Sequence, residues 1–381
     1  MSQSTIRIGI VGLSTSPIIF GGWGAHAHLP ALLASPHYKL VAVANSTVES
    51  AKKSIEHHKL GSDVKAYGSP EDIAQDPDVD LVVVCVMVDT HYNLTKPALL
   101  AGKNVYVEWP LATSTAEAEE LAELASSKNV KTIVGTQGRA DPVTVKLREL
   151  ISGGKIGSVI SVNAIAVLNA GFPMDKWLAG MEWYVKKESA GNIYKISFAH
   201  FYESFLHIFG EFSTFSSILE NRYNTVALVD MATGQVVDPA YPRTSPDQVL
   251  LQGILKSGAV ASVSARMSNN LTVDSIGYRW IITGTEGEIE VTAPYAQWQG
   301  SPAGKKIKVT VGQEGKTEEV AWDENPAYFD TVPDIGKNVA AVYRAFAEGR
   351  KEDYTDFNEA VVLHRLLDNY AAAAENKTIQ N

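Results

Sequence analysis

The first third of the chain alternates short apolar runs with segments whose apolar residues recur at helical spacing. The run at 80–87 (DLVVVCVM) is continuously apolar after its first residue, as in a strand that is buried on both faces. Strands and helices that alternate in this way predict right-handed βαβ units and a parallel, doubly wound sheet. The expected strands are 6–11, 39–44, 80–87, 104–107 and 131–135, with a short segment at 64–67, and the expected helices are 26–34, 47–60, 69–76, 91–101 and 114–127.

The pattern changes after about residue 138. Gly153-Gly154 ends a predicted helix, and alternating runs separated by SG, NN and EG turn signals then predict an antiparallel sheet. The sequence therefore predicts a dinucleotide-binding domain at 1–137 and an α+β substrate and oligomerisation domain at 138–381, whose last helix is a candidate to pack back on the first domain. In this second part the expected helices are 142–152, 334–348 and 356–375, the expected strands are 158–168, 247–256, 259–267, 277–283 and 287–292, and 299–330 is expected to form hairpins and loops.

Charge and cysteine content narrow the class of protein. The formal net charge is −10, and no clustered cations are present that could wrap a nucleic acid. The one cysteine, Cys85, lies in an apolar run and excludes an internal disulfide framework. No apolar stretch reaches the roughly 18 residues that a membrane span needs, and the N-terminus is typical of a first strand rather than a signal peptide. We therefore expect a cytoplasmic protein that contacts neither membrane nor nucleic acid.

The turn after the first predicted strand is the candidate phosphate-binding loop. It begins Gly12-Leu13-Ser14 and continues to Gly21-Gly22-Trp23-Gly24, so Ser14 stands where a G-x-G-x-x-G fingerprint has its second glycine. A longer loop still offers backbone N–H groups to phosphates, and a serine hydroxyl can donate as well. Gly12, Leu13, Ser14 and Trp23 are therefore candidate cofactor-binding residues, although a glycine-rich connection without a ligand is an alternative.

The end of the second predicted strand indicates which dinucleotide binds. A carboxylate there would bind the ribose 2′-OH of NAD, but the sequence has Asn45, Ser46 and Thr47. Asn45 and Ser46 are neutral donors that are compatible with a 2′-phosphate, so NADP is the expected cofactor and NAD stays possible. Ser46 could at the same time be the N-cap of the following helix.

Several ordered motifs carry a resemblance to a known family. The stretch 80–112 combines an apolar strand, a turn with His91, a helix that ends in Ala-Gly-Lys, and Val-Glu-Trp-Pro, with Glu108 17 positions after His91. Further motifs are GTQGRADP at 135–142, LRELISGGKIGSV at 147–159, and the spacing of Gly191, His200 and Gly210. Together they resemble the Gfo/Idh/MocA oxidoreductase family. The resemblance implies a Rossmann domain and an NAD(P)-dependent oxidoreductase, with His91, Glu108, Trp109 and Arg139 at the cofactor.

The chain departs from that family at two catalytic positions. Trp109 replaces the family lysine of Glu-Lys-Pro, and Ile196 replaces the family aspartate that precedes the histidine by four residues. His200 is kept, and Glu203 stands in for a later aspartate. Neither tryptophan nor isoleucine can supply a charge or a transferable proton, so oxidation of a hydroxyl would depend on His200 or on a substitute.

Candidate substitutes lie on the same predicted helix. Lys195 neighbours the lost aspartate, and Tyr194 shares a helical face with residue 198. The predicted catalytic set is therefore His200, Lys195 and Tyr194, and the predicted substrate set is Trp109, Trp183, Tyr202 and Glu203. An amphipathic helix with a satisfied histidine is the alternative. No group of residues has metal-ligand spacing, and His26, His28, His57 and His58 are interpreted as surface or packing residues.

The tryptophan at position 109 suggests a second function. Glu-Trp-x-Leu-Ala, Gln137-Gly138-Arg139, SPDQVLLQG at 245–253 and VLHRLL at 362–367 resemble the fungal galactose/lactose metabolism regulatory branch, whose members share the fold and keep a nucleotide pocket. Two hypotheses follow. The first is an oxidoreductase that acts on a hydroxyl or carbonyl of a sugar-like or small-metabolite substrate. The alternative is a catalytically silent, NADP-sensing transcriptional regulator with a protein partner. The resemblance implies a homodimer in either case.

Overall fold

The chain divides into two compact units, each described here by itself. The computed structural model describes residues 5–17, 21–168, 174–268, 272–296, 303–312, 315–322 and 325–376. Of these, unit 1 contains 5–140 and also 325–365, whereas unit 2 contains 141–322 and the residues from Leu366 onward. Unit 1 first ends at Ala140, three residues after the boundary expected from the sequence. A C-terminal segment of 41 residues also belongs to unit 1, which the expected division did not include.

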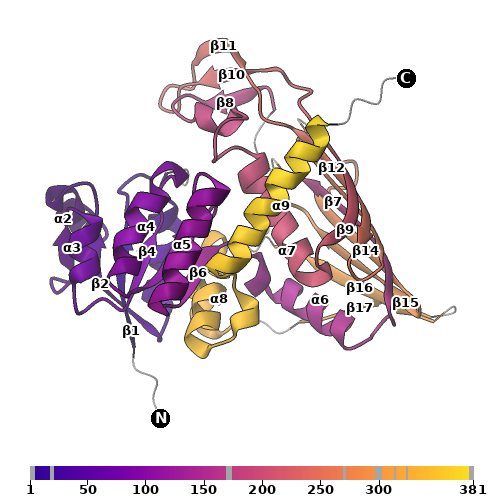
Figure 1. Ribbon diagram of the computed structural model, residues 1–381, viewed down its shortest axis with the longest axis horizontal. Helices are drawn as coiled ribbons and strands as arrows, with labels where there is room; N and C mark the ends of the chain where they lie inside the picture. Colours follow the sequence, from indigo (N-terminus) through magenta and orange to yellow (C-terminus); the bar gives the residue numbers. More distant parts are fainter. Residues whose placement is uncertain are drawn as a thin grey trace. The chain divides into compact units, whose positions relative to one another are not determined.

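Unit 1 is built on a parallel sheet of six strands with the order β3-β2-β1-β4-β5-β6 (Figure 1). The chain turns back at β1, so the strands that follow β1 lie on both sides of it, as in a doubly wound fold. The carboxyl ends of β1 and β4 therefore meet at the switch point where such sheets bind ligands. The strands are β1 (Ile6–Val11), β2 (Tyr38–Ala44), β3 (Lys65–Tyr67), β4 (Leu81–Val84), β5 (Asn104–Glu108) and β6 (Thr132–Gly135).

Helices cover both faces of this sheet. One face packs α1, α2 and α8 in a single apolar cluster that includes Leu32, Ala51 and Val339. The other face packs α3, α4 and α5, which contact one another in sequence order. Serine or threonine residues cap the N-termini of α2, α3 and α5. The helices are π-helix η1 (Gly24–His28), α1 (Leu29–Ala34), α2 (Val48–His57), α3 (Pro70–Gln75), α4 (His91–Leu100), α5 (Thr115–Lys128), α8 (Asp334–Glu348) and the first part of α9 (Phe357–Glu375).

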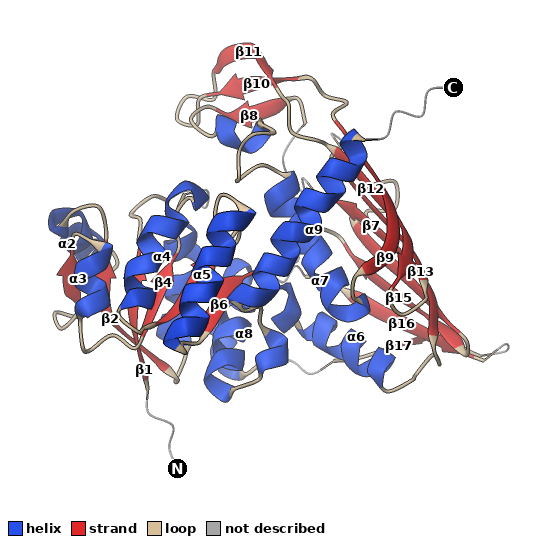
Figure 2. Cartoon of the chain, viewed as in Figure 1, coloured by secondary structure: helices blue, strands red, loops and turns tan. Residues whose placement is uncertain are grey.

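Unit 2 is built on a mixed sheet of eight strands with the order β17-β16-β15-β14-β7-β13-β12-β9 (Figure 2). All its pairs are antiparallel except β7 with β13, which is parallel. The expected fold class, a Rossmann domain plus an α+β domain with a mostly antiparallel sheet, is confirmed. The strands are β7 (Val159–Val167), β9 (Phe212–Glu220), β12 (Gln248–Leu255), β13 (Val260–Arg266), β14 (Tyr278–Gly284), β15 (Gly287–Ala293), β16 (Lys306–Val311) and β17 (Glu318–Glu319).

An aromatic core joins the large sheet to helix α7 (Ala199–Phe209). Phe201 and Phe205 on α7 contact the Trp280 ring on β14, with ring centroids 6.1 and 6.0 Å apart. Tyr202 lies against Tyr370 of α9. Because these side chains are almost completely buried, α7 is held rigidly over one face of the sheet. Helix α6 (Pro142–Ser152) begins at Asp141, whose carboxylate accepts the Val143 N–H.

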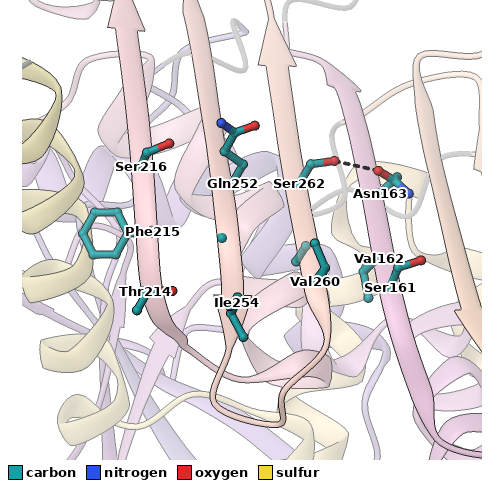
Figure 3. Close-up of a pocket in the computed structure, with 12 residues that line it drawn as sticks. Ser161, Val162, Asn163, Thr214, Phe215, Ser216, Gln252, Ile254, Val260 and Ser262 are labelled. Atoms are coloured by element: carbon teal, nitrogen blue, oxygen red, sulfur yellow. Dashed lines mark hydrogen bonds between the residues drawn. The ribbon is translucent and has the colours of Figure 1, made fainter. Parts of the chain in front are cut away.

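The opposite face of the large sheet carries no helix of unit 2 among the described residues. Exposed side chains on this face alternate along each strand with buried ones. Ile254 and Val260 lie there among serine, threonine and amide side chains (Figure 3). Ser262 donates to Asn163 at 2.8 Å in the middle of this shallow hollow. We call it the outer face; its exposed apolar residues are Ile165, Ile218, Leu250, Ile254 and Val260.

The structure differs from the sequence-based expectation in several places, among them strand β9, which no expected strand covers. Strand β4 ends at Val84 rather than at residue 87, because the chain turns out of the sheet at Cys85. Segment 299–330 contributes β16 and β17 to the large sheet in addition to loops. A small three-stranded sheet, β11-β10-β8, was not expected at all. Its strands are β8 (Lys176–Leu178), β10 (Thr225–Val229) and β11 (Val236–Pro242).

Candidate functional site

Two glycines shape the turn at the end of β1. Gly12 adopts φ +94°, and a Cβ there would lie 2.2 Å from Val86 Cγ1, so only glycine fits this tight turn. A Cβ on Gly24, the first residue of η1, would lie 2.6 Å from Cys85 Sγ. Gly24 therefore allows the close approach of helix and strand that the third glycine of a dinucleotide fingerprint provides. This role of Gly24 was not predicted from the sequence.

The backbone after Gly12 is held by side chains rather than by further glycines. Leu13 is buried, and its carbonyl accepts from Asn45 Nδ2 at 3.2 Å and from Ser54 Oγ at 2.7 Å. Ser14 Oγ accepts the Ser16 N–H at 3.0 Å, so this hydroxyl has a local partner in addition to any ligand. The Asn45 amide thus faces the loop, and no carboxylate occupies the turn after β2.

The neighbouring residues Ser46 and Thr47 are exposed. Thr47, not Ser46, caps α2: its hydroxyl accepts the Ser50 N–H, and Ser50 reciprocates in a capping box. The Ser46 side chain is therefore not needed as the helix cap. Its exposed position at the end of β2 is compatible with the 2′-phosphate contact expected for it.

A buried hydrogen-bonded chain surrounds Glu108 at the end of β5. His28 Nε2 lies 2.8 Å from Glu108 Oε1, and His28 Nδ1 lies 2.7 Å from the Tyr343 hydroxyl. Gln137 Nε2 donates to both carboxylate oxygens, at 2.9 and 3.0 Å. A Cβ on Gly135 would lie 2.3 Å from Glu108 Oε1, so this glycine makes room for the carboxylate. Glu108 is thus held in one position by Gln137, which follows β6, and by His28 on η1, whose other ring nitrogen is bound to Tyr343 on α8.

His91 lies between two backbone carbonyls. Its Nδ1 is 2.7 Å from Pro110 O, and its Nε2 is 3.1 Å from Val86 O. Burial lowers the pKa of His91 below its ordinary value, which favours the neutral imidazole. His91 therefore ties the turn after β4 to the segment that follows Trp109, and any effect it has on a cofactor would act through these two turns.

Trp109 packs against a histidine that sequence analysis did not single out. The rings of Trp109 and His364 have centroids 4.7 Å apart, and both side chains are buried. His364 lies on α9 within unit 1. The position that holds lysine in the family is thus filled by an indole in contact with an imidazole.

Arg139 lies in a charged cluster between η3 (Gly138–Ala140) and the first turn of α9. Arg139 Nη1 is 2.5 Å from Glu359 Oε1, and Lys351 Nζ contacts the other carboxylate oxygen at 2.6 Å. Burial alone would raise the pKa of Glu359, but the charge of Arg139 and the bond from Lys351 hold it below its ordinary value. Arg139 therefore meets a carboxylate inside unit 1.

Two buried polar atoms test whether a dinucleotide fits unit 1. Trp23 Nε1 and Gln137 Oε1 have no hydrogen-bond partner among the described residues. Trp23 lies next to Gly24 at the start of η1, and Gln137 lies beside Glu108, where it adopts φ +36°. Because buried polar groups are normally satisfied, both atoms are consistent with a polar ligand at the carboxyl ends of the strands.

Helix α7 of unit 2 holds the predicted acid–base residue. His200 is 5% exposed and Glu203 is 1% exposed, on a helix whose other residues are mostly aromatic or apolar. Lys195 lies on π-helix η5 (Tyr194–Phe198), which runs directly into α7, and is only partly buried.

The two predicted tyrosines have hydroxyl partners inside unit 2. Tyr194 donates to Leu367 O at 2.8 Å, and Tyr202 Oη lies 2.5 Å from Tyr370 Oη. Burial raises the pKa of both phenols well above the ordinary value. This geometry favours a packing role over proton transfer for Tyr194 and Tyr202.

Trp183 lies in a second aromatic group of unit 2, on η4 (Glu182–Val185). Its ring meets Tyr184 edge-on at 5.7 Å, and Tyr184 stacks on Trp177 at 4.5 Å and 8°. Trp183 is only partly buried, whereas Trp177 donates its N–H to Met181 O and is buried. Trp183 is thus the more accessible of the two indoles.

Neither a membrane-spanning helix nor a metal site is found among the described residues. No helix in the described ranges has the length and apolar character that crossing a bilayer requires. No three His, Cys, Asp or Glu side chains of the described residues form a group that could hold a metal ion. Cys85 is buried as expected, and burial raises the pKa of its thiol.

Comparisons with known proteins agree with this architecture. The model of the oxidoreductase family with an NAD-binding Rossmann fold matches residues 6–136, and the model of the Gal80p C-terminal domain matches residues 142–293. The dehydrogenase aclE of Aspergillus oryzae is 30% identical over 375 residues, which cover 97% of this chain and 96% of that protein.

Regulatory proteins are similar as well. The galactose/lactose metabolism regulatory protein GAL80 of Kluyveromyces lactis is 31% identical over 307 residues, which cover 76% of this chain and 64% of that protein. The crystal structure of the transcriptional regulator Gal80p from the same yeast has a TM-score of 0.83 at 27% identity, with 98% of this chain and 90% of that chain covered. The chain therefore belongs to the Gfo/Idh/MocA family of NAD-binding oxidoreductases, with a C-terminal domain of the Gal80p type.

Proposed function

We propose that the protein is an NADP-dependent oxidoreductase with a rebuilt active site, and that it acts on a hydroxyl or carbonyl group of a sugar-like or small-metabolite substrate. When bound, the nicotinamide supplies or accepts the hydride. In the direction of oxidation, His200 would take the proton of the substrate hydroxyl group. In the reverse direction His200 returns that proton to the new hydroxyl group.

One observation carries the proposal. His200 is kept as a buried imidazole, one helical turn before the buried carboxylate of Glu203, in a helix that otherwise serves as an aromatic core. An imidazole with a carboxylate one helical turn away is an arrangement that general acid–base catalysis uses. The end-to-end similarity to a protein named a dehydrogenase supports the same conclusion.

The proposed cofactor contacts lie in unit 1. Gly12, Leu13, Ser14 and Trp23 would surround the phosphates, and Glu108, Trp109 and Arg139 would lie towards the nicotinamide, with His91 holding the turns. NADP is preferred over NAD because Asn45 and Ser46 place no negative charge after β2.

The proposed substrate contacts are Trp109, Trp183 and Glu203, whereas the buried Tyr202 hydroxyl, which is bound to Tyr370, would support α7. Lys195 would assist His200, because its ammonium group can stabilise a developing alkoxide. Tyr194 would support the helix through its bond to Leu367. Trp183 offers an aromatic surface on which a sugar ring could stack.

The test begins with a fluorescence titration of the purified protein with NADPH and NADH. Polyol and carbonyl substrates are then screened with the cofactor that binds more tightly. With a substrate in hand, His200→Ala should lower kcat/KM by about 10²- to 10⁴-fold. His207→Ala is the matched control, because His207 lies on the same helix but contacts Arg148 at 3.0 Å. Unchanged turnover in His200→Ala would remove His200 from the mechanism.

A second function rests on a different observation. Trp109 and Ile196 occupy the two positions where the family places its lysine and aspartate, and GAL80 of Kluyveromyces lactis is a regulatory protein. A nucleotide-sensing regulator without turnover is therefore the alternative, and it would act on a protein partner. It predicts tight NADPH binding and no substrate in the screen, so steady protein-dependent turnover would exclude it.

We further propose a cytoplasmic homodimer that forms through the outer face of the large sheet. The five exposed apolar residues of this face lie on the adjacent strands β7, β13, β12 and β9, and their burial against a second copy would remove them from water. Sedimentation equilibrium tests the proposal. The wild type should be dimeric and Ile254→Lys monomeric, whereas a wild type that is monomeric at micromolar concentration would contradict it.

A further inference from the structure

The backbone that follows Gly12 has three carbonyls bound by side chains. Leu13 O accepts from Asn45 and Ser54, as described above. His58 Nε2 donates to Ser14 O at 2.8 Å, and His26 Nε2 donates to Ser16 O at 3.2 Å. From the sequence, Asn45 is expected at the 2′-phosphate of NADP, and His26 and His58 are interpreted as surface or packing residues.

Helix α2 and its C-cap residue supply two of these donors. Ser54 lies on α2 and His58 directly follows its last residue, and both side chains donate to carbonyls of the loop. Ser54 is 2% exposed, and its hydroxyl also contacts Asn45 Nδ2 at 3.0 Å. The neighbouring His57 is exposed, although its ring lies 4.8 Å from that of His58.

The geometry of the peptide bond determines what this arrangement does. In a trans peptide the C=O and the following N–H point in opposite directions. Because Leu13 O is bound by Asn45 and Ser54, the Ser14 N–H points away from α2. Because Ser14 O is bound by His58, the Thr15 N–H points away from His58. Two successive N–H groups are thereby turned outward at the carboxyl end of β1, and consecutive N–H groups are good ligands for an anion.

We propose that Asn45, Ser54 and His58 are positioning residues for dinucleotide binding: they aim the Ser14 and Thr15 N–H groups at a phosphate of the cofactor. The fingerprint normally uses its second glycine to bring the backbone close to the pyrophosphate. This chain has Ser14 at that position, and side chains of α2 fix the local backbone instead. The inference rests on the dinucleotide-binding part of the proposed function and does not depend on turnover.

The decisive variants change His58 while leaving the rest of α2 intact. His58→Leu removes the donor to Ser14 O, whereas His58→Gln keeps an N–H donor at a similar reach. His57→Leu is the matched control, because it makes the same change at the adjacent, exposed position. Ser54→Ala removes the shorter of the two bonds to Leu13 O.

The measurement is the dissociation constant for NADPH and for adenosine, which has no phosphate, by isothermal titration calorimetry or by competition. We expect His58→Leu and Ser54→Ala each to weaken NADPH binding roughly three- to tenfold, as the loss of one hydrogen bond in the positioning set would do. His58→Gln should restore most of the affinity, and His57→Leu should not change it. Adenosine binding should be the same in all variants, because no phosphate is involved.

The possible outcomes separate this inference from the proposed function. NADPH binding that is weakened in His58→Leu and restored in His58→Gln supports the inference even when the substrate screen finds no turnover, in which case only the oxidoreductase proposal fails. Equal losses in His57→Leu and His58→Leu would overturn it, as would a parallel loss of adenosine binding, which would indicate general disruption of unit 1. A wild type that binds neither NADPH nor NADH would overturn it as well.

Discussion

The buried chain from Tyr343 to Glu108 leads to a quantitative prediction for Tyr343→Phe. With Glu108 accepting through Oε1, the Nε2 of His28 carries the proton, so Nδ1 accepts from the Tyr343 hydroxyl. Burial raises the pKa of Tyr343 well above its ordinary value, so the phenol stays a donor. The substitution keeps the ring, which packs edge-on against Tyr38 and obliquely against Tyr106. It removes one hydroxyl and leaves a buried acceptor without its donor.

The expected cost follows from the burial of both partners. Tyr343 and His28 are completely inaccessible, so water cannot replace the lost bond, and leaving a buried group unsatisfied costs about 1–3 kcal/mol. Tyr38→Phe is the control, since Tyr38 is also buried and donates at 2.6 Å to Tyr343 O. That acceptor lies inside α8 and keeps the hydrogen bond of the helix, so the control should cost only about 0.5–1.5 kcal/mol.

Native-state hydrogen exchange measures both variants within unit 1. The slowest amides of β5 should exchange about 30-fold faster in Tyr343→Phe, which corresponds to about 2 kcal/mol, and about fivefold faster in Tyr38→Phe. In a His28→Leu background the acceptor is absent, so adding Tyr343→Phe should change exchange little. Additive effects of the two substitutions would refute the hydrogen-bonded chain as the origin of the stability.

Three further predictions concern the cofactor, acid stability and the family lysine. Ser46→Asp places a carboxylate after β2 and should lower the affinity for NADPH relative to NADH by about tenfold or more, measured by fluorescence titration; an unchanged ratio would place the 2′-phosphate elsewhere. A hydrogen bond from Arg7 holds the pKa of Asp80 below its ordinary value. The ionised carboxylate therefore stabilises unit 1 above about pH 4, and this stabilisation is lost as the pH falls further. Asp80→Asn should therefore flatten the acid limb of a urea-unfolding profile between about pH 5 and 2, and a limb as steep as that of the wild type would contradict this origin. Trp109→Lys restores the family residue but buries an ammonium group against His364. We expect this substitution to destabilise unit 1 by about 3 kcal/mol in the same hydrogen-exchange experiment. Trp109→Phe, which keeps an aromatic ring, is the control and should cost less.

Much of the fold could be predicted because its signals are local. Helix α6 has the predicted bounds 142–152, since Asp141-Pro142 begins it and Gly153-Gly154 follows it. Helix α8 likewise has the predicted bounds 334–348 and ends before Gly349. By contrast, the parallel pairing of β7 with β13 could not be predicted, because alternation shows that a strand has two faces but not which strand lies beside it. Strand β11 was missed because two of its seven residues are prolines.

The candidate site likewise has residues that the sequence indicates and residues that only the structure identifies. Gly12 could be predicted as a turn residue from its place after an apolar run. The motif around Glu108 indicated that this carboxylate belongs to the candidate cofactor site. The partners of Glu108 could not be found from the sequence, since His28 is 80 positions away and Tyr343 is 315 positions from His28. His364 was missed for a similar reason, because nothing in VLHRLL indicates a contact with Trp109. Only the tertiary structure brings these residues together.

The return of α8 to unit 1 affects how the protein is synthesised. Helix α8 supplies part of the core of the first unit, but it begins at Asp334, about 200 residues after the last strand of the sheet ends at Gly135. At about 5–20 residues per second, the nascent sheet waits roughly 10–40 s for this helix. We therefore expect the nascent residues 1–140 to depend on chaperones during translation, and a fragment that ends at residue 140 to aggregate rather than fold as a free nucleotide-binding domain.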